Sequence, residues 1–163
     1  MRIRRYRSPD RDAVIGLFRD FMRELAPPAL AAEFDAYVET AIREELSRIE
    51  DYYAGGAFWV AEEERVVGMV GIERHGQDSA ELRRMAVDRQ YRRKGIGREL
   101  LATAEAYCRA SGYRKVVLST SELQVAARQL YETSGYRLVR QEVAVAQSHK
   151  TAGAGLTRYH YEK

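Results

Sequence analysis

A short basic stretch that contains two glycines is the part of the sequence best suited to chemistry. It reads RRKGIG over residues 92–97 and lies between a strand pattern and an amphipathic helix pattern. The first N–H groups of a helix lack partners and carry partial positive charge. Glycines let a ligand approach this backbone, and the three basic residues add full charges. Together these features predict a binding site for a pyrophosphate group.

Two other phosphate-binding patterns are absent from the chain. There is no Gly-x4-Gly-Lys-Ser/Thr segment. A dinucleotide-binding Gly-x-Gly-x-x-Gly pattern would start at Gly95 and Gly97, but its third position is Leu100. Without a ligand, the stretch would be a surface turn with solvated arginines. Its place after a strand and before a helix favours the functional interpretation.

Helical spacing of apolar residues predicts four helices around this stretch. Ser8 and Pro9 are typical of a helix start, and the helix that follows ends at Pro27-Pro28. The second is predicted over residues 32–53, and Gly55-Gly56 ends it. The other two are predicted over residues 96–111 and 123–134.

Short apolar runs between the helices predict strands. Their expected ranges are 3–7, 57–61, 66–72, 81–87, 115–120, 136–145 and 156–161. The element order is therefore β-α-α-β-β-β-α-β-α-β-β, which indicates a mixed α/β or α+β sheet with helices on both faces. No repeat or linker divides the chain, so we expect a single domain over residues 1–163.

The charge of the chain is concentrated around the basic stretch. Residues 81–98 carry +5, whereas the whole chain carries +3, so all other residues together carry −2. This pattern predicts a small polyanionic ligand rather than a nucleic acid. A sequence pI near 9 keeps nucleic-acid binding as an alternative, and a steep salt dependence would reveal it.

Composition excludes several other classes of protein. The 163 residues include 16 aromatic side chains, which can support a core without disulfide bonds or a structural metal ion. The single cysteine, Cys108, excludes an intramolecular disulfide and is expected in the core of a helix face. The three histidines show no metal-ligand spacing, so no metal site is expected. No run is long enough to span a membrane and no secretory signal is evident, so we expect a cytoplasmic protein with no membrane partner.

Residues 92–97 resemble the acetyl-CoA-binding motif of the Gcn5-related N-acetyltransferases, Arg/Gln-x-x-Gly-x-Gly/Ala. The inferred element order is similar to that fold along essentially the whole chain. Residues 58–61, 117–120 and 126–136 also resemble the branch that acetylates cysteine conjugates and related amines. The resemblance implies one acyl-CoA N-acyltransferase domain with a mixed, mostly antiparallel seven-stranded sheet and about four helices.

The resemblance also implies how acetyl-CoA, the co-substrate, would bind. The strand before the loop would pair with the pantetheine arm, the loop amides would hold the pyrophosphate, and strand 115–120 would splay to admit the thioester. The residues expected at acetyl-CoA are Met85, Ala86, Val87, Arg92, Arg93, Lys94, Gly95, Ile96, Gly97, Arg98, Thr120 and Tyr131.

Two side chains are candidates for proton transfer in the reaction that the resemblance implies. An amine attacks the thioester carbonyl directly in a ternary complex, and a phenol can protonate the departing thiolate. Tyr131 is the matching tyrosine; its alternative role is a core tyrosine. Glu81 matches a base glutamate of some members; its alternative role is a salt bridge at a strand edge, and ordered water could replace it. The amide of Val87 is a candidate for polarising the carbonyl.

The acceptor is expected to be a small primary amine held by the first two helices and the last hairpin. Phe21, Tyr37, Tyr159 and Tyr161 are the candidate lining residues. A protein N-terminus or lysine is the alternative acceptor, and a non-catalytic acyl-CoA sensor is the alternative function. Members of the family are often dimers, so the resemblance allows a homodimer.

Overall fold

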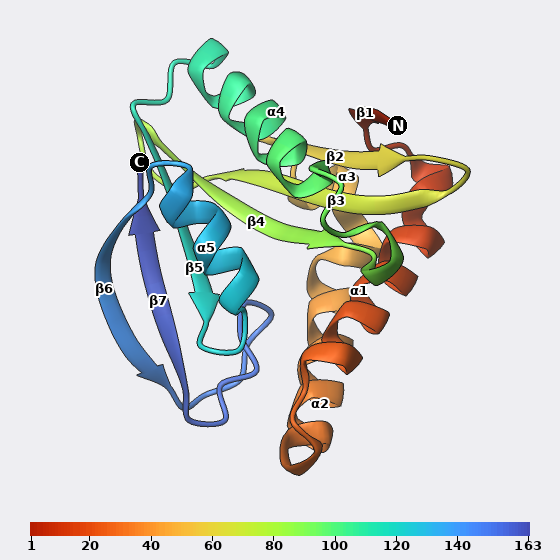
Figure 1. The fold of residues 1–163 in the computed structure, drawn as a ribbon, viewed down its shortest axis with the longest axis vertical. Helices are drawn as coiled ribbons and strands as arrows, with labels where there is room; N and C mark the ends of the chain where they lie inside the picture. Colours follow the sequence, from red (N-terminus) through yellow and green to blue (C-terminus); the bar gives the residue numbers. More distant parts are fainter.

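One seven-stranded sheet organises the computed structural model, which describes residues 1–163 (Figure 1). The strands lie in the order β1-β2-β3-β4-β5-β7-β6, and every neighbouring pair is antiparallel except the parallel pair β4 and β5. The predicted mixed, mostly antiparallel seven-stranded sheet is confirmed. The strands are β1 (Arg2–Arg5), β2 (Ala57–Glu62), β3 (Val66–Arg74), β4 (Ser79–Val87), β5 (Lys115–Ser121), β6 (Arg137–Ala144) and β7 (Leu156–Glu162).

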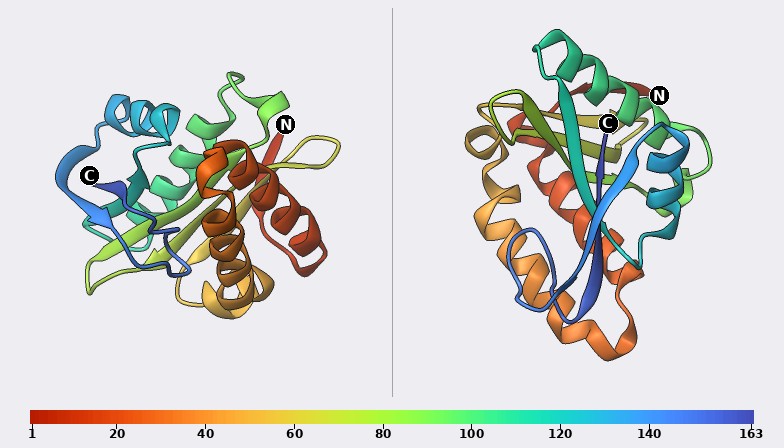
Figure 2. Two further views of the ribbon diagram at one scale, coloured as in Figure 1. Left: turned by 90° about the horizontal axis from the view of Figure 1, so that it is seen from below. Right: turned by 90° about the vertical axis from the view of Figure 1, so that its left-hand side faces the viewer.

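Helices cover both faces of the sheet, as Figures 1 and 2 show. Alternate residues of the strands supply two separate cores, because neighbouring side chains point to opposite faces. In β2, Trp59 packs into the core that includes α4, whereas Phe58 packs into the core that includes α1 and α2. The helices are α1 (Arg11–Leu25), α2 (Ala31–Glu44), α3 (Ile49–Tyr52), α4 (Ile96–Ala110) and α5 (Val125–Thr133). None of them has the length and apolar character to cross a membrane.

The prediction of one helix over residues 32–53 is wrong. The chain leaves the α-helix after Glu44, makes a 3-10 turn over Leu46–Arg48, and resumes as the short α3. At the break Glu45 has φ −135° and ψ −63°, outside the helical region. Its side chain is fully buried and accepts hydrogen bonds from Arg83, Arg84 and Tyr53. Periodicity continued through the break because apolar residues occur on both sides of it.

The gap between β4 and β5 is the feature that positions the site. The two strands pair only where residues 79–81 lie beside residues 115–117. Beyond that point they separate, and residues of both strands line one cavity. A register shift in the β3–β4 pair accompanies this separation, and Arg84 there has a φ of +58°, which is uncommon for a residue other than glycine. The predicted splay of strand 115–120 is therefore present.

Candidate active site

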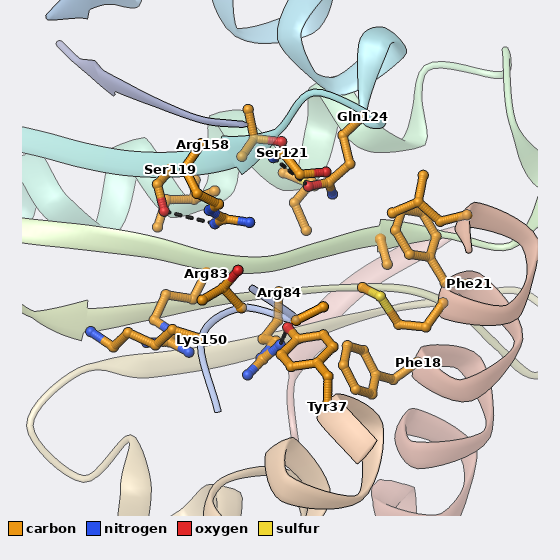
Figure 3. A pocket seen from close by; sticks show the side chains of 18 of the residues that line it. Phe18, Phe21, Tyr37, Arg83, Arg84, Ser119, Ser121, Gln124, Lys150 and Arg158 are labelled. Atoms are coloured by element: carbon orange, nitrogen blue, oxygen red, sulfur yellow. Dashed lines mark hydrogen bonds between the residues drawn. The ribbon is translucent and has the colours of Figure 1, made fainter. Parts of the chain in front are cut away.

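Two adjoining cavities lie where β4 and β5 separate. The loop cavity, of about 770 Å³, extends from β4 to the start of α4 and to α5. The inner cavity, of about 100 Å³, lies between α1, α2, β4, β5 and the end of the chain, and Figure 3 shows it. Both cavities are lined by Phe21, Leu25, Met85, Ala86 and Gln124, so the two spaces meet along β4.

The start of α4 forms one wall of the loop cavity. Gly95 caps the helix with a φ of +83°, a conformation that favours glycine. The first helical hydrogen bond at this end runs from the N–H of Glu99 to the carbonyl of Gly95. The N–H groups of residues 96–98 therefore have no partner within the helix, and these residues line the cavity. A β-carbon at Gly97 would touch Leu130 at 3.5 Å, an ordinary contact, so packing alone does not require glycine there.

The basic side chains of the loop have different surroundings. Arg92 donates from Nε to the Val87 carbonyl at 2.9 Å and from Nη2 to Glu24 at 2.5 Å, which fastens the loop to α1. Lys94 does not line the loop cavity, because its Nζ lies over the ring of Tyr91, 4.8 Å from the centroid. Arg93 and Arg98 line the cavity and form no ion pair with the chain. Two cations are thus free for an anion at the helix start.

Met85, Ala86 and Val87 lie where sequence reasoning placed them, along the wall of the loop cavity. They belong to the part of β4 that has no pairing partner in β5. A strand that has no neighbour on one side can pair there with an extended ligand through its backbone groups. The structure therefore brings the expected strand and the expected loop to one cavity.

Tyr131 lies in the inner cavity, on α5. Its side chain is buried, and its ring packs at 5.8 Å from the ring of Tyr136. Its hydroxyl makes no hydrogen bond to the protein, and burial raises its pKa above the usual value. The phenol is therefore protonated at neutral pH and can act as a proton donor.

Thr120 and Gln124 form a polar link at the junction of the cavities. Thr120 donates from Oγ1 to Gln124 Oε1 at 2.8 Å, and the Ser121 amide donates to the same oxygen at 3.1 Å. The Thr120 side chain is thereby fixed at the wall of the inner cavity. Both bonds use the oxygen of Gln124, so its amide nitrogen is left without a protein partner. Sequence reasoning missed Gln124.

Glu81 lies at the far end of the inner cavity, near the start of β4. Its carboxylate accepts from Lys150 Nζ at 3.2 Å and lies 3.6 Å from His75 Nδ1. A carboxylate is a group that can take a proton from an amine in the cavity. Glu73 is already bound by Tyr52 and Arg83. Glu81, the predicted base, is the carboxylate that lines the inner cavity.

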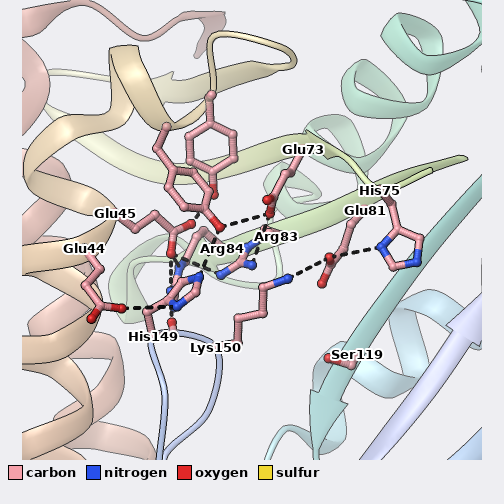
Figure 4. A network of polar contacts seen from close by, with 12 residues as sticks. Glu44, Glu45, Glu73, His75, Glu81, Arg83, Arg84, Ser119, His149 and Lys150 are labelled. Carbon is pink, nitrogen blue, oxygen red and sulfur yellow. Dashed lines mark hydrogen bonds and ion pairs between the residues drawn. The ribbon is translucent and has the colours of Figure 1, made fainter. Parts of the chain in front are cut away.

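Arg83 and Arg84 lie on β4, apart from the basic loop, and belong to a buried polar network between β4 and α2 (Figure 4). Because Arg84 has a positive φ, both neighbours in sequence reach the same buried Glu45. Arg84 also donates to the Tyr37 hydroxyl at 2.6 Å and to the carbonyl of His149. The expectation that the basic residues of 81–98 gather in one place is therefore wrong: the strand arginines and the loop arginines serve different cavities.

The last hairpin corrects part of the expected acceptor site. Phe21 and Tyr37 line the inner cavity, but Tyr159 and Tyr161 do not. Both tyrosines lie on the α5 side of β7, where they interact with Arg128. Because side chains alternate along a strand, Arg158 points to the cavity instead. Tyr159 and Tyr161 are two residues apart and therefore share one face of β7. This spacing could have indicated that Arg158 faces the opposite side.

Residues 145–155 pass over the inner cavity from the side opposite α5. Gln147 donates to the Ala36 carbonyl at 3.2 Å and to Thr40, which ties the segment to α2. Lys150 and Thr151 from this segment line the inner cavity. The chain thus partly encloses the space beside β4. No group of three or more His, Cys, Asp or Glu side chains lies close enough together to hold a metal ion.

Comparison with known proteins identifies the family. The profile described as the acetyltransferase (GNAT) family matches residues 18–136. The chain belongs to the acetyltransferase (GNAT) family. Among its GNAT relatives, N-acetylaspartate synthetase of Xenopus tropicalis is 38% identical over 122 residues, which cover 72% of this chain and 44% of that protein. The Homo sapiens N-acetylaspartate synthetase is 40% identical over 107 residues, which cover 63% and 35%.

One further relative and one solved structure are similar to this chain over most of its length. A "Probable N-acetyltransferase camello" of Xenopus tropicalis is 33% identical over 138 residues, covering 81% of this chain and 63% of that protein. The chain spans less than half the length of the N-acetylaspartate synthetases it matches. Ribosomal-protein-alanine N-acetyltransferase from Brucella melitensis superposes with a TM-score of 0.77 at 22% identity, covering 100% and 99% of the two chains. That likeness shows the GNAT fold.

Proposed function

We propose that this chain transfers an acetyl group from acetyl-CoA to the primary amine of a small molecule. The observation that carries the proposal is the meeting of the loop cavity and the inner cavity along the part of β4 that has no partner in β5. One cavity offers backbone N–H groups and cations to a pyrophosphate. The other contains a proton donor, Tyr131, and a carboxylate, Glu81.

The lining of the loop cavity fits the chemistry of acetyl-CoA. The N–H groups of residues 96–98, with Arg93 and Arg98, supply donors and positive charge for a pyrophosphate. Residues 85–87 have β3 on one side and no partner in β5 on the other, so the backbone groups on that open side can pair with the amide groups of the pantetheine arm. A Salmonella typhimurium protein with a TM-score of 0.71 and 18% identity, covering 100% of this chain and 92% of that one, was solved with acetyl-CoA. That likeness supports the choice of co-substrate.

The inner cavity supports a chemical role for each side chain. The amine nitrogen attacks the thioester carbonyl carbon, and the carbon–sulfur bond breaks. Glu81, directly or through water, accepts the proton that the amine loses. Tyr131 donates its proton to the departing thiolate and recovers one from solvent. Backbone amides of β4 near Val87 polarise the carbonyl oxygen.

A small acceptor is favoured by the enclosure of the inner cavity and by the relatives. Residues 145–155 lie over this cavity, which leaves a space of about 100 Å³ beside β4. The relatives named N-acetylaspartate synthetase, at 38–40% identity, carry the name of a small acetylated amino acid. A protein acceptor would require an open groove for an extended chain.

Calorimetric titration with acetyl-CoA tests the co-substrate, with Gly97→Glu as the decisive variant. A β-carbon fits at this position and a carboxylate is favourable in a first helical turn, so the fold should be retained. The new carboxylate would occupy the anion site, and we expect acetyl-CoA affinity to fall at least about 100-fold. Gly16→Ala, on α1 with no atom within 4 Å of the added carbon, is the matched control. Equal binding by all three proteins would overturn the proposed loop site.

Turnover is then tested by release of the CoA thiol with a panel of small amines and short peptides. We expect the small amines to be acetylated and Tyr131→Phe to be slow. Binding of acetyl-CoA with no turnover of any acceptor would indicate a sensor, and faster turnover of peptides would indicate a protein acceptor. Either result contradicts the proposed function.

A further inference from the structure

The inner cavity contains one more positive charge than the carboxylates around it can balance. Four cationic side chains line it, and three carboxylates contact them. Glu45 binds both strand arginines, Glu73 binds the first of these, and Glu81 binds the lysine. The four cations are Arg83, Arg84, Lys150 and Arg158.

Arg158 is the cation that has no carboxylate partner. It lies on β7 directly opposite Ser121 of β5, and its Nη2 donates to the Ser119 hydroxyl at 2.8 Å. No acidic side chain lies within 4 Å of its guanidinium. Burial lowers the pKa of Arg158, and the nearby Arg84 and Arg83 add to this effect. An arginine nevertheless stays ionised in a protein, so the charge persists without compensation.

The place of Arg158 indicates the kind of anion that it can bind. It lines the inner cavity and not the loop cavity, so it is separate from the site proposed for the pyrophosphate. The excess is a single charge, which one carboxylate neutralises. A guanidinium offers a planar pair of donors that matches the two oxygens of a carboxylate. Ser119 holds one nitrogen of the guanidinium, and Figure 3 shows the group at the cavity wall.

We propose that the acceptor amine carries a carboxylate and that Arg158 binds this carboxylate. The inference rests on the proposed acetyl transfer and names the class of its acceptor. With the carboxylate held at β7, the amine of a small molecule lies toward β4, on the side where the two cavities meet. Arg158 is thus a specificity-determining residue. Acceptors without a carboxylate leave its charge uncompensated in the bound state, which disfavours their binding.

The test compares each amino acid with its primary amide and with the amine that lacks the carboxyl group. Initial rates of CoA thiol release are measured for the wild type, Arg158→Gln and Arg158→Lys. Arg140→Gln is the control, because Arg140 is an exposed arginine on the neighbouring strand of the same hairpin. We expect the wild type to prefer the best amino acid over its amide by about 100-fold in kcat/KM. Arg158→Gln should abolish this preference, mainly by raising the KM of the amino acid, whereas Arg140→Gln should keep the wild-type preference.

Arg158→Lys separates charge from geometry. A lysine retains the charge without the planar pair of donors, so we expect a partial preference for the carboxylate. Thermal unfolding without acceptor supplies a second measurement. If Arg158 is kept for binding, Arg158→Gln should unfold at the wild-type temperature or about 2–4 °C higher, because an uncompensated charge is removed.

Each other outcome overturns the inference in a recognisable way. Turnover of amines with no preference for a carboxylate would overturn it and leave the acetyl transfer standing. An equal loss of turnover on amino acids and amides in Arg158→Gln would assign Arg158 to the reacting thioester. A markedly lower unfolding temperature would assign Arg158 a structural role. Absence of turnover with every amine would overturn the proposed function, and the inference with it.

Discussion

Replacing Glu45 by glutamine tests the buried charge network most directly. The Glu45 side chain is fully buried at the break between α2 and α3. It accepts from Arg83 Nη2 at 3.1 Å, from Arg84 Nε at 2.9 Å, and from the Tyr53 hydroxyl. Glutamine has nearly the same shape but no charge. In the variant, Glu73 would be the one carboxylate left beside the two buried guanidiniums. It forms an ion pair with Arg83 but not with Arg84.

The expected cost follows from this geometry. Removing one partner of a buried ion pair typically costs about 3–5 kcal/mol, because the remaining charge is buried without compensation. For a chain of 163 residues, each kcal/mol lowers Tm by about 2–4 °C. We therefore expect Glu45→Gln to unfold about 6–20 °C below the wild type at pH 7.

The pH dependence of stability gives the same prediction a second readout. Burial alone would raise the pKa of Glu45, but Arg84 and Arg83 outweigh it and hold that pKa below its usual value. A lowered pKa stabilises the fold above the unfolded value near about 4.3, and this stability is lost as pH falls below it. The difference between the wild type and Glu45→Gln should therefore be largest at neutral pH and shrink in acid.

Urea unfolding at pH 7 and at lower pH values measures both effects. Glu44→Gln is the matched control, since the adjacent Glu44 is half-exposed and binds His149 at 3.3 Å; its cost should stay below about 1 kcal/mol. Adding Arg84→Met to Glu45→Gln should recover part of the loss, because one uncompensated charge is removed. A loss for Glu45→Gln no larger than that of Glu44→Gln would refute the reasoning.

Three further predictions concern other groups. Tyr131→Phe should lower kcat about 100-fold with little change in Tm, because the Tyr131 hydroxyl has no protein partner. Tyr136→Phe, outside both cavities, should keep the wild-type rate, and equal rates for all three proteins contradict the acid role. Hydrogen bonds from Arg4 and Arg2 lower the pKa of Glu62 to about 2, so Glu62→Gln should be less stable than the wild type at pH 7, and the two stabilities should converge as pH falls toward 2. A constant difference in urea unfolding across this pH range would contradict the prediction. Burial raises the pKa of the Cys108 thiol to about 11, so at pH 8 a disulfide reagent should react slowly with the native protein and rapidly with the protein unfolded in guanidinium. Rapid reaction with the native protein would show that the thiol is accessible.

Features that depend on a few neighbouring residues were predictable from the sequence. Gly95 with its positive φ, the helix start after it, and the order of the strands are local properties. The buried position of Tyr131 on α5 also follows from local spacing. The helix break at Glu45 was not predictable, because its cause is a contact with Arg83, 38 residues later in the chain. The same holds for Lys94, whose charge is directed over Tyr91 rather than toward the loop cavity.

The sequence by itself therefore determined where the strands and most of the helices lie along the chain, and that a basic, glycine-containing loop at residues 92–97 precedes a helix. Backbone preferences and side-chain periodicity act over a few residues, and a single chain displays them. Only the tertiary structure decided how the charges are shared around the inner cavity. Strands β4 and β7 and residues 145–155 bring four cations to three carboxylates, and Arg158 is left without a counter-ion. Charge balance depends on which groups meet in space, because electrostatic attraction is set by distance and burial and not by order along the chain.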